Sequence, residues 1–403
     1  MSASTPKAPI PVFRPQVPSA ARRRLERALD SGWLGYGPEC LALESAFTSR
    51  RGGWALATSS CTSALYLAGR LIHASSDVDQ PEIIVPAVTF VASAVAFLQA
   101  GVKPVLGDVD PETMLLDVDA APRALSPRTR ALLVVHLYGQ RHPGLAGLRA
   151  FADDHGLLLI EDCAHRVDLL DNAPPQGDLL CYSFNAVKEL PGGDGGLIWG
   201  RNPATERCVR EVSNLGLTVD TMQRAATLHH ADYGFGTMPG LKLRSNDIAA
   251  SLVNAAMDHL PGWRAQRRDQ FRRYDLSLAP LAPVVRPLHR EDDDSCLMYV
   301  VKLPAAIRER IRARLASAGI ATSVHYPSLA WHPLLGSKAS GACCESEDER
   351  LVTLPTFLGL SAGAIDRIAS ELAHAVVQET KHPAADAPLA EDARTASWDT
   401  RPR

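Results

Sequence analysis

The strongest constraint on the fold is an alternation of short apolar runs with helical stretches, which begins at Trp54 and continues to about Phe184. The runs are WALATS, EIIVP, PVLGDV, ALLVVHLYG, LLLIEDC and LLCYSF, and helical patterns follow from about Thr62 and over Ala92–Gln99. This alternation predicts βαβ units, and runs that are apolar on both faces predict parallel strands covered by helices on each side. The sequence therefore predicts an α/β fold with a large, mostly parallel sheet.

The second half of the chain does not continue this alternation. From about Asp247 a long helical pattern leads to YVVKL, a charged helical stretch over 305–318, and the short strand-like run ATSVHYP. A chain of 403 residues is longer than one core usually supports. We therefore predict a large domain over 1–250, which includes the N-terminal segment, and a smaller α+β domain over 251–380. Residues 381–403, rich in Pro, Ala and charge, are predicted to be a disordered tail.

Composition argues against several classes of function. The formal net charge is −3 and the charges are interspersed, so nucleic acid is not expected as a partner. No stretch is apolar and long enough to span a membrane, and the first residues lack the apolar core of a signal peptide. The eight cysteines show neither zinc nor disulfide spacing, so we expect reduced thiols in a cytoplasmic protein.

Polar residues stand where several predicted strands end. Ligands of open α/β sheets bind outside the carboxyl ends of the strands, so these residues are expected to share one pocket. They are Ser59, Asp108, His136, Asp162 and Ser183.

Lys188 is the residue that indicates which reaction this predicted pocket could support. It follows the strand that ends at Ser183 and precedes a loop with four glycines within 192–196, where backbone can approach a ligand closely. A lysine amine in this setting is suited to a Schiff base with pyridoxal 5'-phosphate (PLP). That cofactor also needs an acid near its ring nitrogen, donors for its phosphate and a group over its ring.

The chain offers a candidate for each of these needs. Asp162 follows an apolar strand and is placed to hold the pyridinium proton, and His165 to reach the ring hydroxyl or its face. Phe90 follows the strand EIIVP and is the candidate for stacking on the ring. The run TSSCTSAL begins a helix whose free N–H groups and hydroxyls suit an anion, so the phosphate candidates are Cys61, Thr62 and Ser183. Taken singly, each feature is also explained by an ordinary cap or turn.

In their order these parts resemble the DegT/StrS-type sugar aminotransferases, which are fold-type I PLP-dependent enzymes. The resemblance covers about residues 8–380. It rests on nine segments in the family's order: GWLGYGPECLALE, SSCTSAL, PAVTFVAS, GDVDPETMLLD, VVHLYGQ, IEDCAH, YSFNAVKELPGGDGG, GLKLRSNDIAA and HYP.

The resemblance implies a role for each matching residue. Lys188 is the lysine that bonds PLP, Asp162 contacts the pyridine nitrogen and His165 lies near the ring, while the phosphate contacts are Thr62 and Ser183. It also implies a homodimer with shared active sites, in which the segment 240–246 crosses into the partner's site. Lys242 stands there in place of the usual asparagine and is the candidate for a phosphate contact.

The resemblance further implies an amino-group transfer. The donor is glutamate or glutamine and the acceptor a keto-sugar or related cyclic ketone, with Lys188 acting as imine partner and then as the base that moves a proton. The chain departs from the family beside the phosphate, where Cys61 replaces a glycine. It also departs beside the acceptor pocket, where RVDLLDNAPPQ follows His165 in place of small residues. The candidate substrate-binding residues are Trp33, Tyr36, His325 and Tyr326.

Three alternatives stay open on the sequence. A PLP-dependent sugar dehydratase is one, although relatives with that activity replace the lysine with histidine. A non-catalytic cofactor-binding or sugar-binding regulator is another, although no DNA-binding module is evident. The third is a metal-dependent enzyme that uses some of the 13 histidines, such as the adjacent His229 and His230, but none has a helical ligand spacing. His136 is then expected to be a pocket residue at a strand end.

Overall fold

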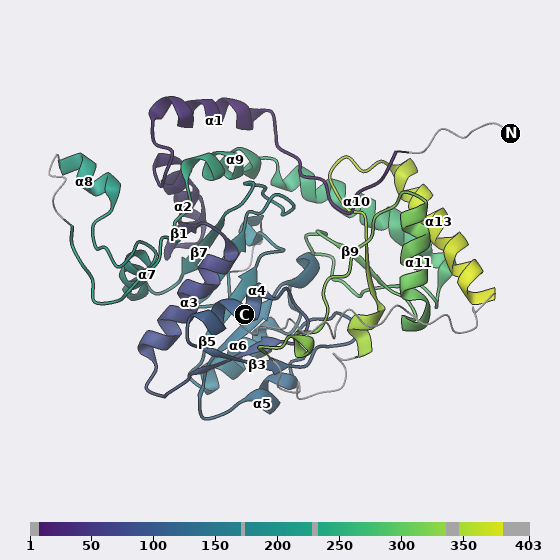
Figure 1. Ribbon diagram of the computed structural model, residues 1–403, viewed down its shortest axis with the longest axis horizontal. Helices are drawn as coiled ribbons and strands as arrows, with labels where there is room; N and C mark the ends of the chain where they lie inside the picture. The colour runs from purple at the N-terminus through teal and green to yellow at the C-terminus, as the bar shows by residue number, and fades with distance from the viewer. Residues whose placement is uncertain (1–7, 171–173, 228–232, 336–345, 382–403) are drawn as a thin grey trace, which may run out of the picture.

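The computed structural model describes residues 8–170, 174–227, 233–335 and 346–381. Its centre is a seven-stranded sheet of order β1-β7-β6-β5-β4-β2-β3 (Figure 1). Strand β7 runs antiparallel to both neighbours and the other pairs are parallel, which confirms the predicted α/β fold with a mostly parallel sheet. The strands are β1 (Trp54–Thr58), β2 (Glu82–Pro86), β3 (Lys103–Gly107), β4 (Thr129–Val135), β5 (Leu158–Cys163), β6 (Leu179–Ser183) and β7 (Gly196–Gly200).

Helices surround this sheet and continue beyond it (Figure 1). Helix α4 has the predicted bounds, whereas α2 and α13 were not predicted. No described helix is long and apolar enough to cross a membrane. In chain order the helices are α1 (Ala20–Ser31), α2 (Pro38–Arg51), α3 (Cys61–Ser75), α4 (Ala92–Gln99), α5 (Ala120–Ala124), α6 (Leu145–Asp154), α7 (Glu206–Val212), α8 (Thr221–Thr227), α9 (Asp247–Met257), α10 (Leu260–Leu278), α11 (Ala305–Ser317) and α13 (Ala362–Lys381).

Side chains of the large sheet alternate between two helical layers. Leu133 and Val135 of β4 pack in the layer of α3 and α4, whereas Leu132 and Val134 pack with α5 and α6 on the opposite face. Beneath β1, β6 and β7 this opposite face is covered by α2 and α9. Because both faces are covered, every residue of β1, β2, β6 and β7 is buried, as is typical of a parallel-type sheet.

A second, antiparallel sheet of three strands lies in the C-terminal part of the chain. Its order is β10-β9-β8, with β8 (Arg286–Pro287), β9 (Tyr299–Lys302) and β10 (Leu351–Leu354). Residues of α10, α11 and α13 pack with it around a separate core that includes Tyr274 and Tyr299.

The C-terminal part of the chain differs from the predicted pattern at one strand. The predicted strand in ATSVHYP is wrong, because Ser323 makes one isolated bridge to Thr353 and the chain then leaves the small sheet for the loop after β2. The division into 1–250 and 251–380 stays a prediction; α9 crosses that boundary and packs against α1 and α2. Of the predicted tail, only Lys381 is described, as the last residue of α13.

A buried ion pair joins the loop after β6 to α10. Glu189 is 1% exposed, and its carboxylate accepts hydrogen bonds from Arg264 Nε at 2.7 Å and from the backbone N–H of Val167 at 2.6 Å. The Arg264 guanidinium also donates to the Val167 carbonyl. One carboxylate therefore ties together α10, the turn after β5 and the turn that carries Lys188.

We expect Glu189→Ala to lower the free energy of unfolding by about 3–5 kcal/mol, because it leaves the Arg264 charge buried without its partner. Urea unfolding of the purified variants measures this loss. Asp366→Ala serves as the control, since its ion pair with Arg273 is half exposed and its removal should change stability far less. Equal effects of the two substitutions would contradict the prediction.

Candidate active site

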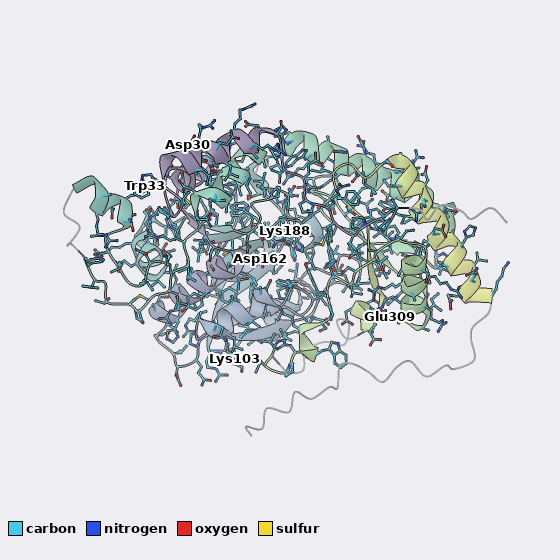
Figure 2. The ribbon with its side chains drawn as sticks, turned by 45° about the horizontal axis from the view of Figure 1, so that its top comes forward. Asp30, Trp33, Lys103, Asp162, Lys188 and Glu309 are labelled. Carbon is cyan, nitrogen blue, oxygen red and sulfur yellow. The ribbon has the colours of Figure 1, made fainter. Side chains whose placement is uncertain are left out.

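The carboxyl ends of β5 and β6 face a cavity of about 490 Å³, a size typical of small-molecule sites. It lies beside the first turns of α3 and α4, and Figure 2 shows Asp162 and Lys188 near the middle of the molecule. The cavity brings together nine of the residues singled out in the sequence: Cys61, Thr62, Phe90, Asp162, His165, Ser183, Lys188, His325 and Tyr326.

Lys188 reaches this cavity from the turn that follows β6. Its backbone N–H donates to the Asn185 carbonyl at 2.9 Å, and the chain then turns through Gly193 and Gly195, whose φ angles of +83° and +143° suit glycine. Burial lowers the pKa of the Lys188 amine to about 8, although the nearby Asp162 and Cys61 groups oppose this shift. A large share of the amine is therefore neutral and nucleophilic at mildly alkaline pH.

Asp162 presents a buried carboxylate to the same cavity. It lies on β5 two residues after Ile160, on the sheet face of α3 and α4, and is 3% exposed. Its oxygens accept hydrogen bonds from Ser93 Oγ at 2.8 Å, from the Ala164 N–H at 3.0 Å and from Cys61 Sγ at 3.8 Å. Burial raises its pKa, and among the described residues it forms no ion pair.

His165 is held in one tautomer by its two contacts. The Tyr138 N–H donates to its Nδ1 at 3.1 Å, so the ring proton belongs on Nε2, which lies 3.3 Å from the Tyr326 hydroxyl. Burial, together with the charges of Lys188 and His325, lowers the pKa of His165 well below its usual range. His165 is thus a neutral imidazole that donates toward Tyr326.

The first turn of α3 forms the other end of the cavity. Ser60 caps the helix by accepting the Ser63 N–H at 3.1 Å, which leaves the N–H groups of Cys61 and Thr62 without an intrahelical acceptor. Gly196 allows β7 to approach this turn, since an added Cβ would lie 2.4 Å from the Ser60 carbonyl carbon. Two free N–H groups at a helix start suit a phosphate.

Aromatic side chains enclose the cavity on the side of the small sheet. Phe90 is 52% exposed, and its ring centroid lies 5.5 Å from that of Tyr326. His325 accepts or donates a hydrogen bond with Thr353 Oγ1 at 2.8 Å, and burial lowers its pKa to about 4. The C-terminal part of the chain thus contributes a neutral histidine and a phenol to the wall.

Trp33, Tyr36 and Lys242 do not line this cavity. Figure 2 shows Trp33 well to the side of Lys188. The Tyr36 hydroxyl instead donates to Glu44 at 2.6 Å. Lys242 is exposed on a segment that runs beside β1, where the Leu243 carbonyl accepts the Ser59 N–H.

The prediction that five strand-end residues share one pocket is correct only for Asp162 and Ser183. Ser59 bonds instead to Ser63 Oγ, and Asp108 to the backbone N–H of Val109. The expectation for His136 is wrong for a physical reason: its partner Glu161 neighbours Asp162 on β5 and therefore points to the opposite face of the sheet.

His136, Glu161 and Cys163 form a buried group with the spacing of a possible metal site. Two of its members already have protein partners: His136 Nε2 lies 2.7 Å from Glu161 Oε2, and Glu161 Oε1 accepts the N–H groups of Gln176 and Gly177. The other predicted candidates, His229 and His230, lie outside the described residues. The contacts of His136 and Glu161 therefore indicate a structural hydrogen-bond network and not a metal site.

The residues of the cavity fit PLP. Asp162 is a buried carboxyl group that forms no ion pair among the described residues, and a protonated ring nitrogen would give it an oppositely charged partner. The N–H groups at the start of α3 suit the phosphate, and Lys188 provides an amine of lowered pKa. Sequence reasoning missed Ser93, Thr89 and Tyr138, because their roles depend on contacts between distant segments.

Comparison with known proteins agrees with this geometry. The model of the DegT/DnrJ/EryC1/StrS aminotransferase family matches residues 16–373. A curated relative, dTDP-4-dehydro-2,3,6-trideoxy-D-glucose 4-aminotransferase from Saccharopolyspora spinosa, is 29% identical over 355 residues, which cover 86% of this chain and 91% of the relative.

Solved structures are similar over most of the chain. The aminotransferase TlmJ from Streptoalloteichus hindustanus has a TM-score of 0.82 at 28% identity, with 92% of this chain and 100% of that chain covered. NtdA from Bacillus subtilis, solved with bound cofactor PMP, has a TM-score of 0.77 at 25% identity, with 89% and 82% covered. The chain therefore belongs to the DegT/DnrJ/EryC1/StrS aminotransferase family and is a PLP-dependent enzyme of fold type I.

Proposed function

We propose that this aminotransferase moves an amino group from glutamate or glutamine to a keto-sugar, and that a nucleotide-linked 4-keto-sugar is the first acceptor class to test. The observation that carries the proposal is the meeting of Lys188 and Asp162 in one cavity, with the Lys188 amine at a pKa of about 8. The name of the Saccharopolyspora relative supports this acceptor class.

The chemistry divides between the cofactor and the chain. When bound, PLP supplies an electron sink through which an amino group and a proton are exchanged at carbon. In the proposed mechanism Asp162 holds the ring nitrogen proton, and Lys188 Nζ takes up and returns the proton at the reacting carbon. His165, a neutral donor, orients the Tyr326 hydroxyl at the cavity wall.

The anionic substrates call for cations that this cavity does not hold in one chain. Among its described lining residues, Lys188 is the only lysine or arginine, whereas a dicarboxylate donor and a sugar diphosphate each carry at least two negative charges. A second subunit is a source of such groups. We therefore propose a homodimer in which Lys242 contributes to the partner's site.

The surface supports a second copy of the chain. The segment between α7 and α9 carries α8 away from the body of the molecule (Figure 1). Leu215, Phe235 and Leu241 of this segment are exposed, as is Phe90 at the cavity. Exposed apolar side chains of this size are typical of an interface between subunits.

We also propose the cytoplasm as the location of the enzyme. The described cysteines are Cys40, Cys61, Cys163, Cys181, Cys208 and Cys296, and all six are free thiols. Free thiols are typical of proteins in reducing compartments.

The cofactor assignment is tested by reduction. Wild-type protein supplied with PLP should gain a visible absorbance, and borohydride should then fix the cofactor mass on the peptide of Lys188. Glutamate or glutamine, added before reduction, should convert the spectrum to that of pyridoxamine phosphate. Lys188→Ala should abolish attachment, whereas Lys103→Ala, a lysine on the far strand β3, should not. Wild-type protein that gains no absorbance would overturn the proposal.

The lowered pKa of Lys188 predicts a pH profile. The neutral amine is the reactive form, so acetylation of Lys188 in apo protein by limiting acetic anhydride should rise through a midpoint near pH 8, the value that burial gives this group. Peptide mass spectrometry measures the rate. Asp162→Asn should lower the midpoint, because the Asp162 charge raises the pKa of Lys188. A midpoint near the ordinary lysine value of 10.5 would contradict the burial argument.

Shared sites predict recovery of activity in mixed dimers. Lys188→Ala and Lys242→Ala should each impair the homodimer, but a hybrid has one site with both lysines intact. After full exchange of equal amounts, half of the dimers are hybrids, so activity should reach about a quarter of wild type. Mass spectrometry of intact dimers verifies exchange. No gain over the separate variants would rule out a role of Lys242 across the interface.

A further inference from the structure

The Ser93 hydroxyl forms a hydrogen bond to a side chain on a distant segment, Asp162. Serine in the first turn of a helix usually bonds to its own backbone. Helix α4 has Val91 as its N-cap and no side-chain cap, and Ser93 Oγ instead donates to Asp162 Oδ2 at 2.8 Å. This bond links two segments 69 residues apart and is fully buried, with Ser93 only 2% exposed.

The hydroxyl of Thr89 forms a hydrogen bond with that of Ser93. Thr89 Oγ1 lies 3.1 Å from Ser93 Oγ, and Thr89 is 1% exposed. Because the Ser93 proton is committed to the carboxylate, Thr89 must be the donor in this pair. The two hydroxyls therefore form a chain with a fixed direction, from Thr89 through Ser93 to Asp162.

We propose that Ser93, backed by Thr89, is a positioning residue that keeps the Asp162 carboxylate ionised and directed at the ring nitrogen of the cofactor. The inference rests on the proposed role of Asp162. It concerns the state of that carboxylate, whereas the proposed function concerns the reaction in which the carboxylate takes part.

The environment of Asp162 explains why such a donor is needed. Burial is the largest influence on its pKa and favours the neutral acid. The groups that act in the opposite direction are the hydroxyl of Ser93, the Ala164 N–H and the charges of Lys188 and His136. The Cys61 thiol adds only a weak donor at 3.8 Å.

Loss of the Ser93 bond should therefore move a proton onto Asp162. A neutral carboxylic acid no longer attracts a protonated ring nitrogen, so the cofactor should lose both affinity and its pyridinium proton. A merely structural serine would affect stability without changing either protonation state. The protonation states of Asp162 and of the ring nitrogen therefore distinguish the two roles.

Ser93→Ala provides the test in two measurements. In apo protein, the ¹³C signal of the Asp162 carboxyl, assigned by its loss in Asp162→Asn, should titrate about one pH unit higher than in wild type. In the loaded enzyme, the ¹⁵N signal of ring-labelled PLP should shift toward the neutral pyridine position. The dissociation constant of PLP should rise about tenfold or more, the usual effect of losing a hydrogen bond to a charged group.

Three further variants serve as controls. Ser93→Thr keeps the hydroxyl and should restore both signals. Thr89→Val removes only the second donor and should shift them by less. Ser183→Ala, at the proposed phosphate end, should weaken PLP binding without moving the ring nitrogen signal.

Wild-type values of both signals in Ser93→Ala would overturn the inference. If wild-type protein binds no PLP, the proposed function fails, while the carboxyl titration in apo protein still decides for or against the Ser93 contact. Circular dichroism of each variant verifies folding. If Ser93→Ala is unstable, Thr89→Val keeps the test available, because loss of the second hydroxyl should shift both signals in the same direction by a smaller amount, and unchanged signals would count against the inference.

Discussion

A buried carboxylate that forms no ion pair among the described residues is the constraint on which the arrangement of this molecule depends. Removing Asp162 from water is costly unless hydrogen bonds or an opposite charge compensate. The chain supplies the hydrogen bonds from α4 and from the turn after β5. A positive charge to pair with Asp162 would then come from a ligand bound in the cavity that Asp162 and Lys188 both line. Cofactor binding and the stability of this region therefore both depend on how the buried Asp162 charge is compensated.

Two adjacent acids of β5, Glu161 and Asp162, lie on opposite faces of the sheet and have different surroundings. Asp162 faces the cavity, whereas Glu161 faces the other layer, where His136 and the N–H groups of Gln176 and Gly177 satisfy its carboxylate. A slip of one residue in the pairing of β5 would exchange the two side chains. The register between β5 and its neighbours β4 and β6 thus determines which of the two acids faces the cavity.

Much of this could be predicted from the sequence, because the apolar runs reveal the strands and the family's motifs bring Lys188, Asp162 and His165 into one pocket. The prediction failed where contacts between distant segments decide. Ser93 has the local pattern of a helix cap and His136 that of a pocket residue, and only the packing of neighbouring strands shows which partner each one finds. Strand β7 was missed because its antiparallel pairing leaves no βαβ rhythm.

The position of β7 also determines when the site can form during synthesis. Among the described strands, β1 is hydrogen-bonded only to β7, which the ribosome makes after five other strands. Pairing between such distant segments is slow, because the entropy of closing the long loop is lost before the contact is gained. The start of α3, which follows β1, waits for the same event. The end of the cavity beside α3 is therefore expected to be among the last parts of the large sheet to assemble, after β7 has been made.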